Sequence, residues 1–182
     1  EMMPSSDLQI DTLLADYNID EEGLVPGSLD YSGKIRNTII TPSDLRCFNH
    51  SFKNFQRQIL VNSQFNGTDR KLTIPSLSIA TEEKDIDILA SGSIEDWQHQ
   101  PVWHVEMNHA NLSESNIDFW VKSFPQIPRE ITRIGSLQLS GRADKNEKGT
   151  TSLLANVSSG AGHVKVSFDI TSDTLFLAKI AT

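Results

Sequence analysis

The segment IDILASGSIE, residues 86–95, shows how this chain folds. Ile86, Ile88, Ala90 and Ile94 all fall at even-numbered positions, and the odd-numbered positions are mostly Asp, Ser and Glu. Successive side chains of a strand point to opposite faces of a sheet, so this period of two predicts a strand with one apolar and one polar face. The same period recurs in the stretches 29–36, 59–66, 103–107, 137–139, 153–157 and 164–170.

Turn-forming residues interrupt the alternation at intervals of about ten to fifteen residues, which favours an antiparallel meander. Examples are NGTDR (66–70), EEKD (82–85) and SSGAG (158–162). The pattern predicts a mainly β fold of roughly nine to eleven strands. The parity of the apolar positions also changes across Pro75 and Ser76, which predicts a bulge or a strand break there.

A short phrase is repeated along the chain. GSLDYSG (27–33) returns as GSLQLSG (135–141), and ILASG (88–92) resembles both. We interpret each copy as a strand that ends in Ser-Gly. Glycine at such a position marks a bend, a bulge or a close approach of two backbones, so the repeats predict a sheet that curls along its length.

Two stretches have the pattern of short helices. In TPSDLRCFNHSF (41–52), Thr41 can cap the helix and Pro42 suits its first turn. In LSESNIDFWVKSFP (112–125), Ser113 is a candidate N-cap and the apolar positions follow helical spacing. The apolar stripe of this second helix consists of Ile117, Trp120, Val121 and Phe124.

Composition limits the classes of function. The 182 residues carry a formal net charge of −8, which argues against a phosphate-binding surface, including one for nucleic acid, and against attraction to anionic lipid head groups. The single cysteine, Cys47, excludes an intramolecular disulfide and a cysteine-based zinc site. No signal peptide is apparent, and both ends have strand-like sequence. We therefore expect residues 1–182 to be one internal segment of a longer protein.

No residues form a convincing catalytic or metal site. The best cluster is HVEMNH, with His104, Glu106 and His109, but its spacing differs from H-E-x-x-H and the alternation places it on the polar side. No G-x-S-x-G elbow, dinucleotide-binding or P-loop motif occurs. We predict that the protein is not an enzyme and needs no cofactor or metal.

The apolar face itself is the remaining candidate site. It could be the filled core of a closed β-sandwich, as in an interaction module of a cell-envelope or secreted protein. It could instead be the floor of an open trough that binds acyl chains. The residues predicted to line it are Leu29, Tyr31, Ile35, Ile59, Val61, Phe65, Leu72, Ile74, Leu77, Ile79, Ile86, Ile88, Ile94, Trp103, Val105, Met107, Leu137, Leu139, Leu153, Val157, Val164, Val166, Phe168 and Ile170.

The order of motifs resembles the AsmA-like family, in particular its TamB branch. The first half carries IITPSDLRCF (39–48), ILVNSQFNGTDRKLTIPSLSIAT (59–81) and IDILASGSIEDW (86–97). The second half, from Ile127 to Ile170, looks like another such unit. The resemblance covers about residues 25–170 and suggests sub-repeats near 25–97 and 98–180. The high content of Asn, Ser and Lys resembles that of a Bacteroidota homologue more than that of an enterobacterial one.

The resemblance implies an elongated, curled antiparallel sheet, folded lengthwise into a taco-like open trough with an apolar inside. Members of the family are periplasmic, are anchored in the inner membrane and are thought to carry phospholipid toward the outer membrane. TamB itself pairs with an outer-membrane barrel of the Omp85 type, which links it to outer-membrane protein assembly. The anchoring helix and the barrel-binding segment are not identifiable in this sequence. We also expect the outermost strands, near 8–14 and 174–180, to be unpaired edges able to self-associate.

Overall fold

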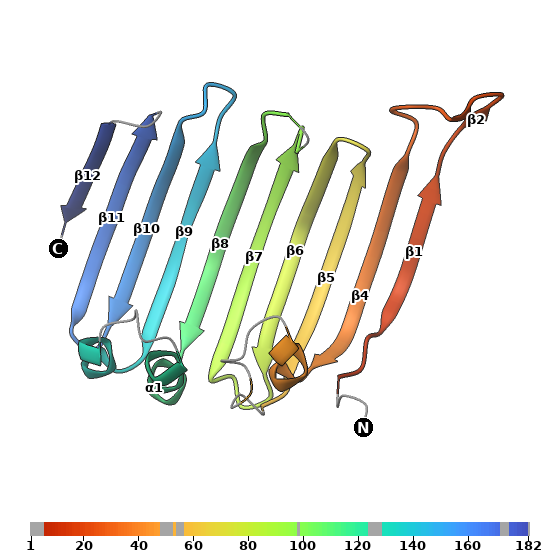
Figure 1. The fold of residues 1–182 in the computed structure, drawn as a ribbon. Coiled ribbons are helices and arrows are strands. Elements are labelled where there is room, and N and C mark those ends of the chain that lie inside the picture. Colours follow the sequence, from red (N-terminus) through yellow and green to blue (C-terminus); the bar gives the residue numbers. More distant parts are fainter. Residues whose placement is uncertain are drawn as a thin grey trace.

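The computed structural model describes residues 6–47, 53, 57–97, 99–123, 129–171 and 175–181. Its main feature is one antiparallel sheet of ten strands whose spatial order follows the chain (Figure 1), so the predicted meander is confirmed. The connection between the first two strands of this sheet contains a small hairpin of β2 (Ile19–Asp20) and β3 (Gly23–Leu24). The ten strands are β1 (Ile10–Asp16), β4 (Asp30–Ile40), β5 (Ile59–Thr68), β6 (Lys71–Thr81), β7 (Ile86–Glu95), β8 (Val102–Leu112), β9 (Leu137–Lys145), β10 (Thr151–Ser159), β11 (Gly162–Thr171) and β12 (Leu175–Ala181).

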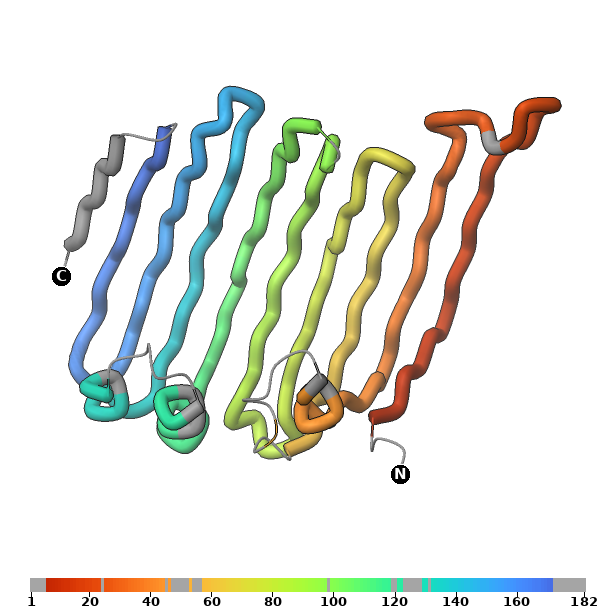
Figure 2. Tube along the Cα trace, viewed as in Figure 1, coloured from red at the N-terminus to blue at the C-terminus, as the bar shows by residue number. Residues whose placement is uncertain are grey.

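The sheet is open. β1 and β12 form its two edges, and each pairs with one neighbour (Figure 1). In Figure 2, β1 and β11 lie on opposite sides of the view, with the other strands between them. A closed β-sandwich needs a second sheet facing the first. In the part of the chain that the structure describes, the only other sheet is the β2–β3 hairpin, so the sandwich alternative is wrong for these residues.

The register divides the main sheet into two faces, because directly opposed residues of antiparallel strands point to the same side. Ile59 pairs with Thr81, Ile79 with Ile88, and Ile88 with Ala110. We call the side that carries these residues the apolar face. The opposite side, the polar face, carries Ser, Asn, Asp, Lys and His residues at most positions.

Bulges cross the middle of the sheet. The pairing register shifts between Ile74 and Leu77 in β6, so the bulge predicted at Pro75 and Ser76 is confirmed. Similar shifts occur in the pairings of β1 with β4, β4 with β5, β5 with β6, β7 with β8 and β8 with β9. A bulge bends its strand and increases the local twist. The extra residues lie in β1, β4, β6 and β8, so every second strand from β4 to β8 is bulged.

The two Gly-Ser-Leu phrases have the same local structure. Their first glycines, Gly27 and Gly135, have φ values of 83° and 69°, a region that suits glycine. Their last glycines, Gly33 and Gly141, lie within β4 and β9. The prediction that these strands end in Ser-Gly is wrong, because both continue past the glycine with neighbours paired on each side.

The expectation of two short helices is also wrong. The described residues contain one α-helix, α1 (Glu114–Ser123), and two 3-10 segments, η1 (Pro42–Cys47) and η3 (Arg129–Ile134). The first predicted helix is only η1, and residues 48–52 of that stretch lie outside the described residues. An isolated α-helix of six residues would leave most of its backbone groups without partners, so the tighter 3-10 turn is favoured.

α1 forms the second predicted helix, which starts where Ser113 accepts hydrogen bonds from the backbone of Asn116 and Ile117. Ile117 and Val121 of the predicted apolar stripe are buried. The side chain of Trp120 and all of Phe124 lie outside the described residues.

The same sequence of elements occurs twice. Each unit begins with a strand, continues with helical segments and ends with three strands. The first unit consists of β4, η1 and β5–β7, and the second consists of β8, α1, η3 and β9–β11. The predicted boundary between sub-repeats at 97/98 falls in the connection from β7 to β8. Whether the chain is an internal segment of a longer protein stays a prediction.

The well-buried core is small and lies at one end of the strands. Among the described residues, the buried apolar side chains are Ile86, Ala110, Ile117 and Val121. Ile86 and Ala110 belong to the apolar face, and the other two belong to α1, so the helix covers the face at this end. All three helical segments lie along the same end of the sheet (Figure 1). We call it the helical end and the opposite end the free end.

The accessible surface is large for the mass of the chain. The protein exposes 12745 Å², whereas a compact monomer of 20.3 kDa exposes about 8,800 Å². The excess follows from a one-layer architecture, in which most residues are open to solvent on one side.

Asn116 ties α1 to the sheet. Its side chain is 2% exposed, and its Nδ2 donates to the Asp85 carbonyl and to Ser113 Oγ, each at 3.1 Å. The Ser113 backbone N–H donates to the same Asp85 carbonyl at 2.8 Å. The turn before β7 is therefore joined to the start of the helix by two hydrogen bonds.

Asn116→Ala is expected to lower the free energy of unfolding by about 1–3 kcal/mol, because it removes buried hydrogen bonds and leaves a void. Urea denaturation followed by circular dichroism measures the change. Lys122→Ala, an exposed position on the same helix, is the control and should change stability by less than about 0.5 kcal/mol. Equal stability of the two variants would show that Asn116 does not anchor α1.

Candidate functional site

The register brings the predicted lining residues together on the apolar face. All of them lie there except Leu29, which directly precedes β4. By strand they are Tyr31 and Ile35; Ile59, Val61 and Phe65; Leu72, Ile74, Leu77 and Ile79; Ile86, Ile88 and Ile94; Trp103, Val105 and Met107; Leu137 and Leu139; Leu153 and Val157; and Val164, Val166, Phe168 and Ile170.

Most of these side chains are only half-buried. Ile86 is the one buried member of the set, and Val105 is 43% exposed. A filled core would bury residues in the middle of the sheet at least as deeply as those at its ends. Here the reverse holds, because burial is deepest at the helical end. The apolar face is thus covered at one end and open over the rest.

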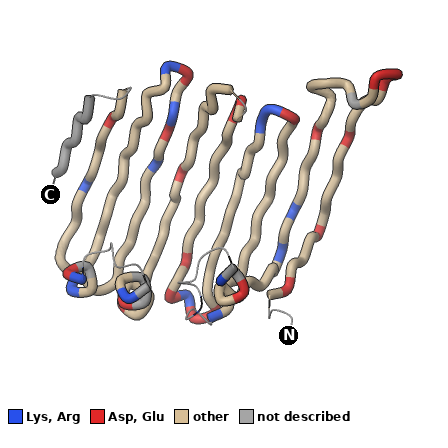
Figure 3. The backbone as a smooth tube through the Cα atoms, viewed as in Figure 1, with Lys and Arg blue, Asp and Glu red and all other residues tan. Residues whose placement is uncertain are grey.

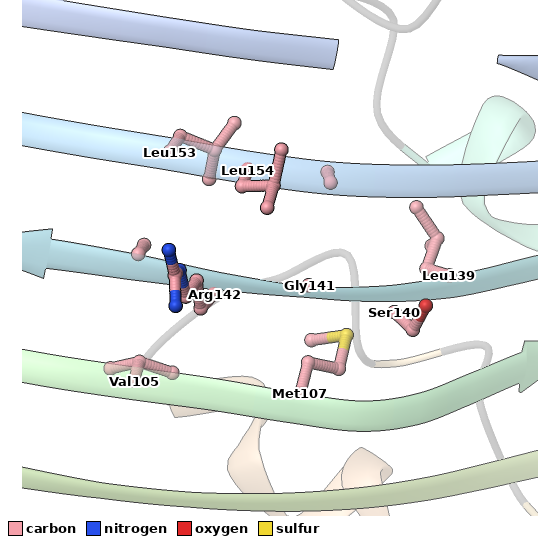
Figure 4. Close-up of a pocket in the computed structure, with 10 residues that line it drawn as sticks. Val105, Met107, Leu139, Ser140, Gly141, Arg142, Leu153 and Leu154 are labelled. Atoms are coloured by element: carbon pink, nitrogen blue, oxygen red, sulfur yellow. The ribbon is translucent and has the colours of Figure 1, made fainter. Parts of the chain in front are cut away.

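Two shallow depressions lie side by side on the apolar face. One, of about 250 Å³, spans β8, β9 and β10 and includes Val105, Met107, Leu139 and Leu153 (Figure 4). The second, of about 280 Å³, spans β6, β7 and β8 between Leu72, Ile74, Ile94 and Trp103. Val105 borders both depressions, so they are adjacent across the strands.

Small residues of the apolar face also contribute to these depressions, and none of them belongs to the predicted lining set. Gly92 lines the second depression, and Gly141, Ala143 and Ala155 line the first. The predicted set consists of large apolar side chains, so it does not include glycine or alanine. The signal was present, since each of these residues continues the period-two alternation of its strand.

The strand glycines have two different roles. An added Cβ at Gly33 would overlap the Phe65 ring, and one at Gly67 would overlap the Lys71 carbonyl oxygen as well as the Tyr31 side chain. These two rings have centroids 6.4 Å apart, so β4 and β5 are covered by an aromatic pair. At Gly141 the three atoms nearest to an added Cβ all belong to the backbone of β10. This close approach leaves the floor of the first depression without a side chain.

The predicted His-Glu-His cluster lies on the polar face, as the alternation indicates. His104 pairs with Asp144 of β9, and His109 Nε2 lies 3.4 Å from Asp87 Oδ1 of β7. Each histidine thus has its own carboxylate partner on a different strand. Within the described ranges, no three His, Cys, Asp or Glu side chains gather as a metal site requires.

The comparisons with known proteins add no candidate function. No family model, curated protein or solved structure matches the chain. No described helix is both long enough and apolar enough to cross a bilayer. The half-exposed apolar face with its two depressions is therefore the feature on which a function can be argued.

Proposed function

We propose that the apolar face binds the acyl chains of lipids, and that the chain is a segment of a trough that conducts phospholipid. The observation that carries this proposal is the half-exposed apolar surface that runs from β1 to β11. Soluble monomers rarely expose contiguous apolar patches larger than a few hundred Å². The apolar face of a sheet is normally covered by a second layer. Hydrocarbon chains would supply such a layer.

The energy of lipid transfer fits such a surface. Exposing a ~16-carbon acyl chain to water costs roughly 10 kcal/mol or more, at about 0.8 kcal/mol per CH₂. A continuous apolar surface removes most of this cost along its length. The side chains that the apolar face contributes to the two depressions are aliphatic, small or aromatic. Arg142 and His104 also border the depressions, but their register places them on the polar face. The apolar face therefore offers no charged anchor, and a bound chain can move from one depression to the next.

The proposal includes a curled, taco-like shape for the sheet. Two features favour it: the register shifts in six neighbouring strands, and the close backbone approach at Gly141. Bulges and strand glycines are the devices by which sheets acquire curvature. Curvature toward the apolar face would shelter the acyl chains from water while leaving the two sheet edges apart.

The resemblance of the motifs to the AsmA-like family extends the proposal to a cellular role. The chain would be a periplasmic portion of a TamB-like protein that is anchored in the inner membrane and works with an outer-membrane barrel of the Omp85 type. Its role would be passage of phospholipid between the membranes, with no catalytic step. The solvent-exposed polar face, with its His–Asp pairs and its Ser and Asn residues, would keep such a trough soluble.

Trp103 provides a direct test of acyl-chain binding. It lies on the apolar face and lines the second depression. In a variant with Trp97→Phe and Trp120→Phe, phospholipid with brominated acyl chains should quench the fluorescence of Trp103. The same lipid without bromine should not, because bromine quenches an indole only at short range.

Moving the tryptophan by one residue provides the control. In the same Trp97→Phe and Trp120→Phe background, Trp103→Phe and His104→Trp together place the single indole on the polar face. His104 lies on that face because it pairs with Ser93. Quenching should then disappear. Equal quenching from both faces, or from neither, would contradict binding at the apolar face.

A further inference from the structure

Lys145 is an exception on the apolar face. It ends β9, where it pairs with Trp103 on one side and with Thr151 on the other. Among the described residues, no other charged residue has a register pairing on this face. A cation placed at the margin of an apolar surface suits a ligand that has both a hydrocarbon part and an anionic part.

A polar hollow of about 300 Å³ surrounds Lys145 at the free end of the sheet. The connection from β7 to β8 forms one wall, and the turn from β9 to β10 forms the other. Figure 3 shows charged residues in this turn and in the upper part of β9, whereas β10, which leaves the turn, carries none. The lining residues are His99, Gln100, Pro101, Lys145, Asn146, Glu147, Lys148 and Gly149.

The two lysines of the hollow have no ion-pair partner among the described residues. Among the basic side chains of the sheet, Lys71 pairs with Glu95, and Arg36 Nε lies 3.3 Å from Asp11 Oδ2. Lys34, Arg142 and Lys165, like Lys145, make no ion pair with a described residue, so the position of Lys145 on the apolar face is what sets it apart. His99 is also engaged, since its hydrogen bond to Asp96 lowers the pKa of that carboxyl. Glu147 is the one carboxylate in the lining, so the hollow holds two ammonium groups against one carboxylate.

The net charge of −8 does not oppose a local anion site. Net charge governs attraction to a distant charged surface, whereas a bound group interacts mainly with charges within about 8 Å at physiological ionic strength. The two lysines supply positive charge at that range.

The hollow and the apolar depressions lie close enough to share a ligand. Ala143, which lines the first depression, precedes Lys145 by two residues on the same face, a separation of about 7 Å along a strand. Trp103, which lines the second depression, is the cross-strand partner of Lys145. A phosphate linked through glycerol to an acyl chain spans a comparable distance.

We infer that this hollow, which we call the headgroup hollow, holds the anionic phosphate of a phospholipid whose acyl chain lies in the adjacent depressions. The inference rests on the proposed function, since it requires lipid on the apolar face. It adds a direction: the headgroup lies at the free end, and the chain extends along β9 toward the helical end.

The test compares phosphatidylglycerol with diacylglycerol that has the same acyl chains and no phosphate. Binding of each is followed by the fluorescence of Trp103 in the full chain that carries Trp97→Phe and Trp120→Phe. The protein should bind phosphatidylglycerol more tightly than diacylglycerol. Lys145→Ala should weaken phosphatidylglycerol binding by about threefold to tenfold, since a partly exposed charge-assisted contact is lost, and should leave diacylglycerol binding unchanged.

Two variants serve as controls. Lys165→Ala removes an exposed lysine from the polar face and should change neither affinity. Lys145→Arg keeps the charge and should retain the preference for phosphatidylglycerol. Thermal melts of all variants verify that they are folded.

The possible failures are distinguishable. Equal affinity for the two lipids, or a preference that survives Lys145→Ala, would overturn the headgroup hollow while leaving acyl-chain binding intact. Absence of binding by both lipids would overturn the proposed function and this inference with it. Inorganic phosphate that displaces phosphatidylglycerol at millimolar concentration would show that the hollow recognises free phosphate and not a lipid headgroup.

Discussion

Val105→Asp is expected to abolish acyl-chain binding while the chain remains folded. Val105 borders both depressions and is 43% exposed, so an aspartate carboxylate at this position can reach water in the lipid-free protein. An acyl chain laid over it would remove that water, and burial of an unpaired carboxylate is strongly unfavourable. We expect affinity for phospholipid to fall by more than about tenfold, with bromine quenching of Trp103 as the measurement.

Leu60→Asp is the matched control for Val105→Asp. Leu60 is 37% exposed and pairs with Ala80 on the polar face, so the substitution and the exposure are similar but the side of the sheet differs. Lipid binding should be unchanged in this variant. Unfolding of Val105→Asp would indicate a filled core at this position, and normal binding by a folded Val105→Asp would remove the lipid-binding proposal.

Ile86→Ala is expected to produce a large loss of stability, about 2–5 kcal/mol, because it opens a cavity in the only well-packed region of the described chain. Ile86 is 4% exposed, lies on the apolar face of β7 and is buried at the helical end. Urea denaturation of the lipid-free protein measures the effect.

Ile94→Ala is the internal comparison. Ile94 lies on the same face of the same strand, near the free end, and is half-buried. Its truncation removes the same methyl groups from a site already open to water, so we expect a loss of about 1 kcal/mol. Equal losses at the two positions would mean that the apolar face is covered along its whole length, and would contradict an open trough.

Much of the fold follows from the period of two. Ile88 and Val166 lie in different halves of the chain, yet local alternation alone assigned both to the apolar face, and the register agrees. The bulge in β6 was also predictable, because the change of apolar parity at Pro75 requires an extra residue there. These features depend on backbone geometry within a single strand, which the sequence encodes directly.

The helical segments were predicted less well. Thr41 and Pro42 correctly indicated the start of a helical turn, but its 3-10 form over six residues depends on how the chain connects β4 to β5. η3 was not predicted at all. Short connecting segments have weak intrinsic preferences, so tertiary connections determine their form.

The sequence by itself determined which side chains share a face, and hence that this protein carries a broad apolar surface. Only the tertiary structure decided that the surface is covered at the helical end and open elsewhere. It also decided that Gly92 and Gly141 each line a depression, and that Lys145 lines a polar hollow. The physical reason is the range of the interactions involved. The direction of a side chain follows from its own strand, whereas cover, depressions and charge at the free end arise from residues that pairing and loops bring together from distant parts of the chain.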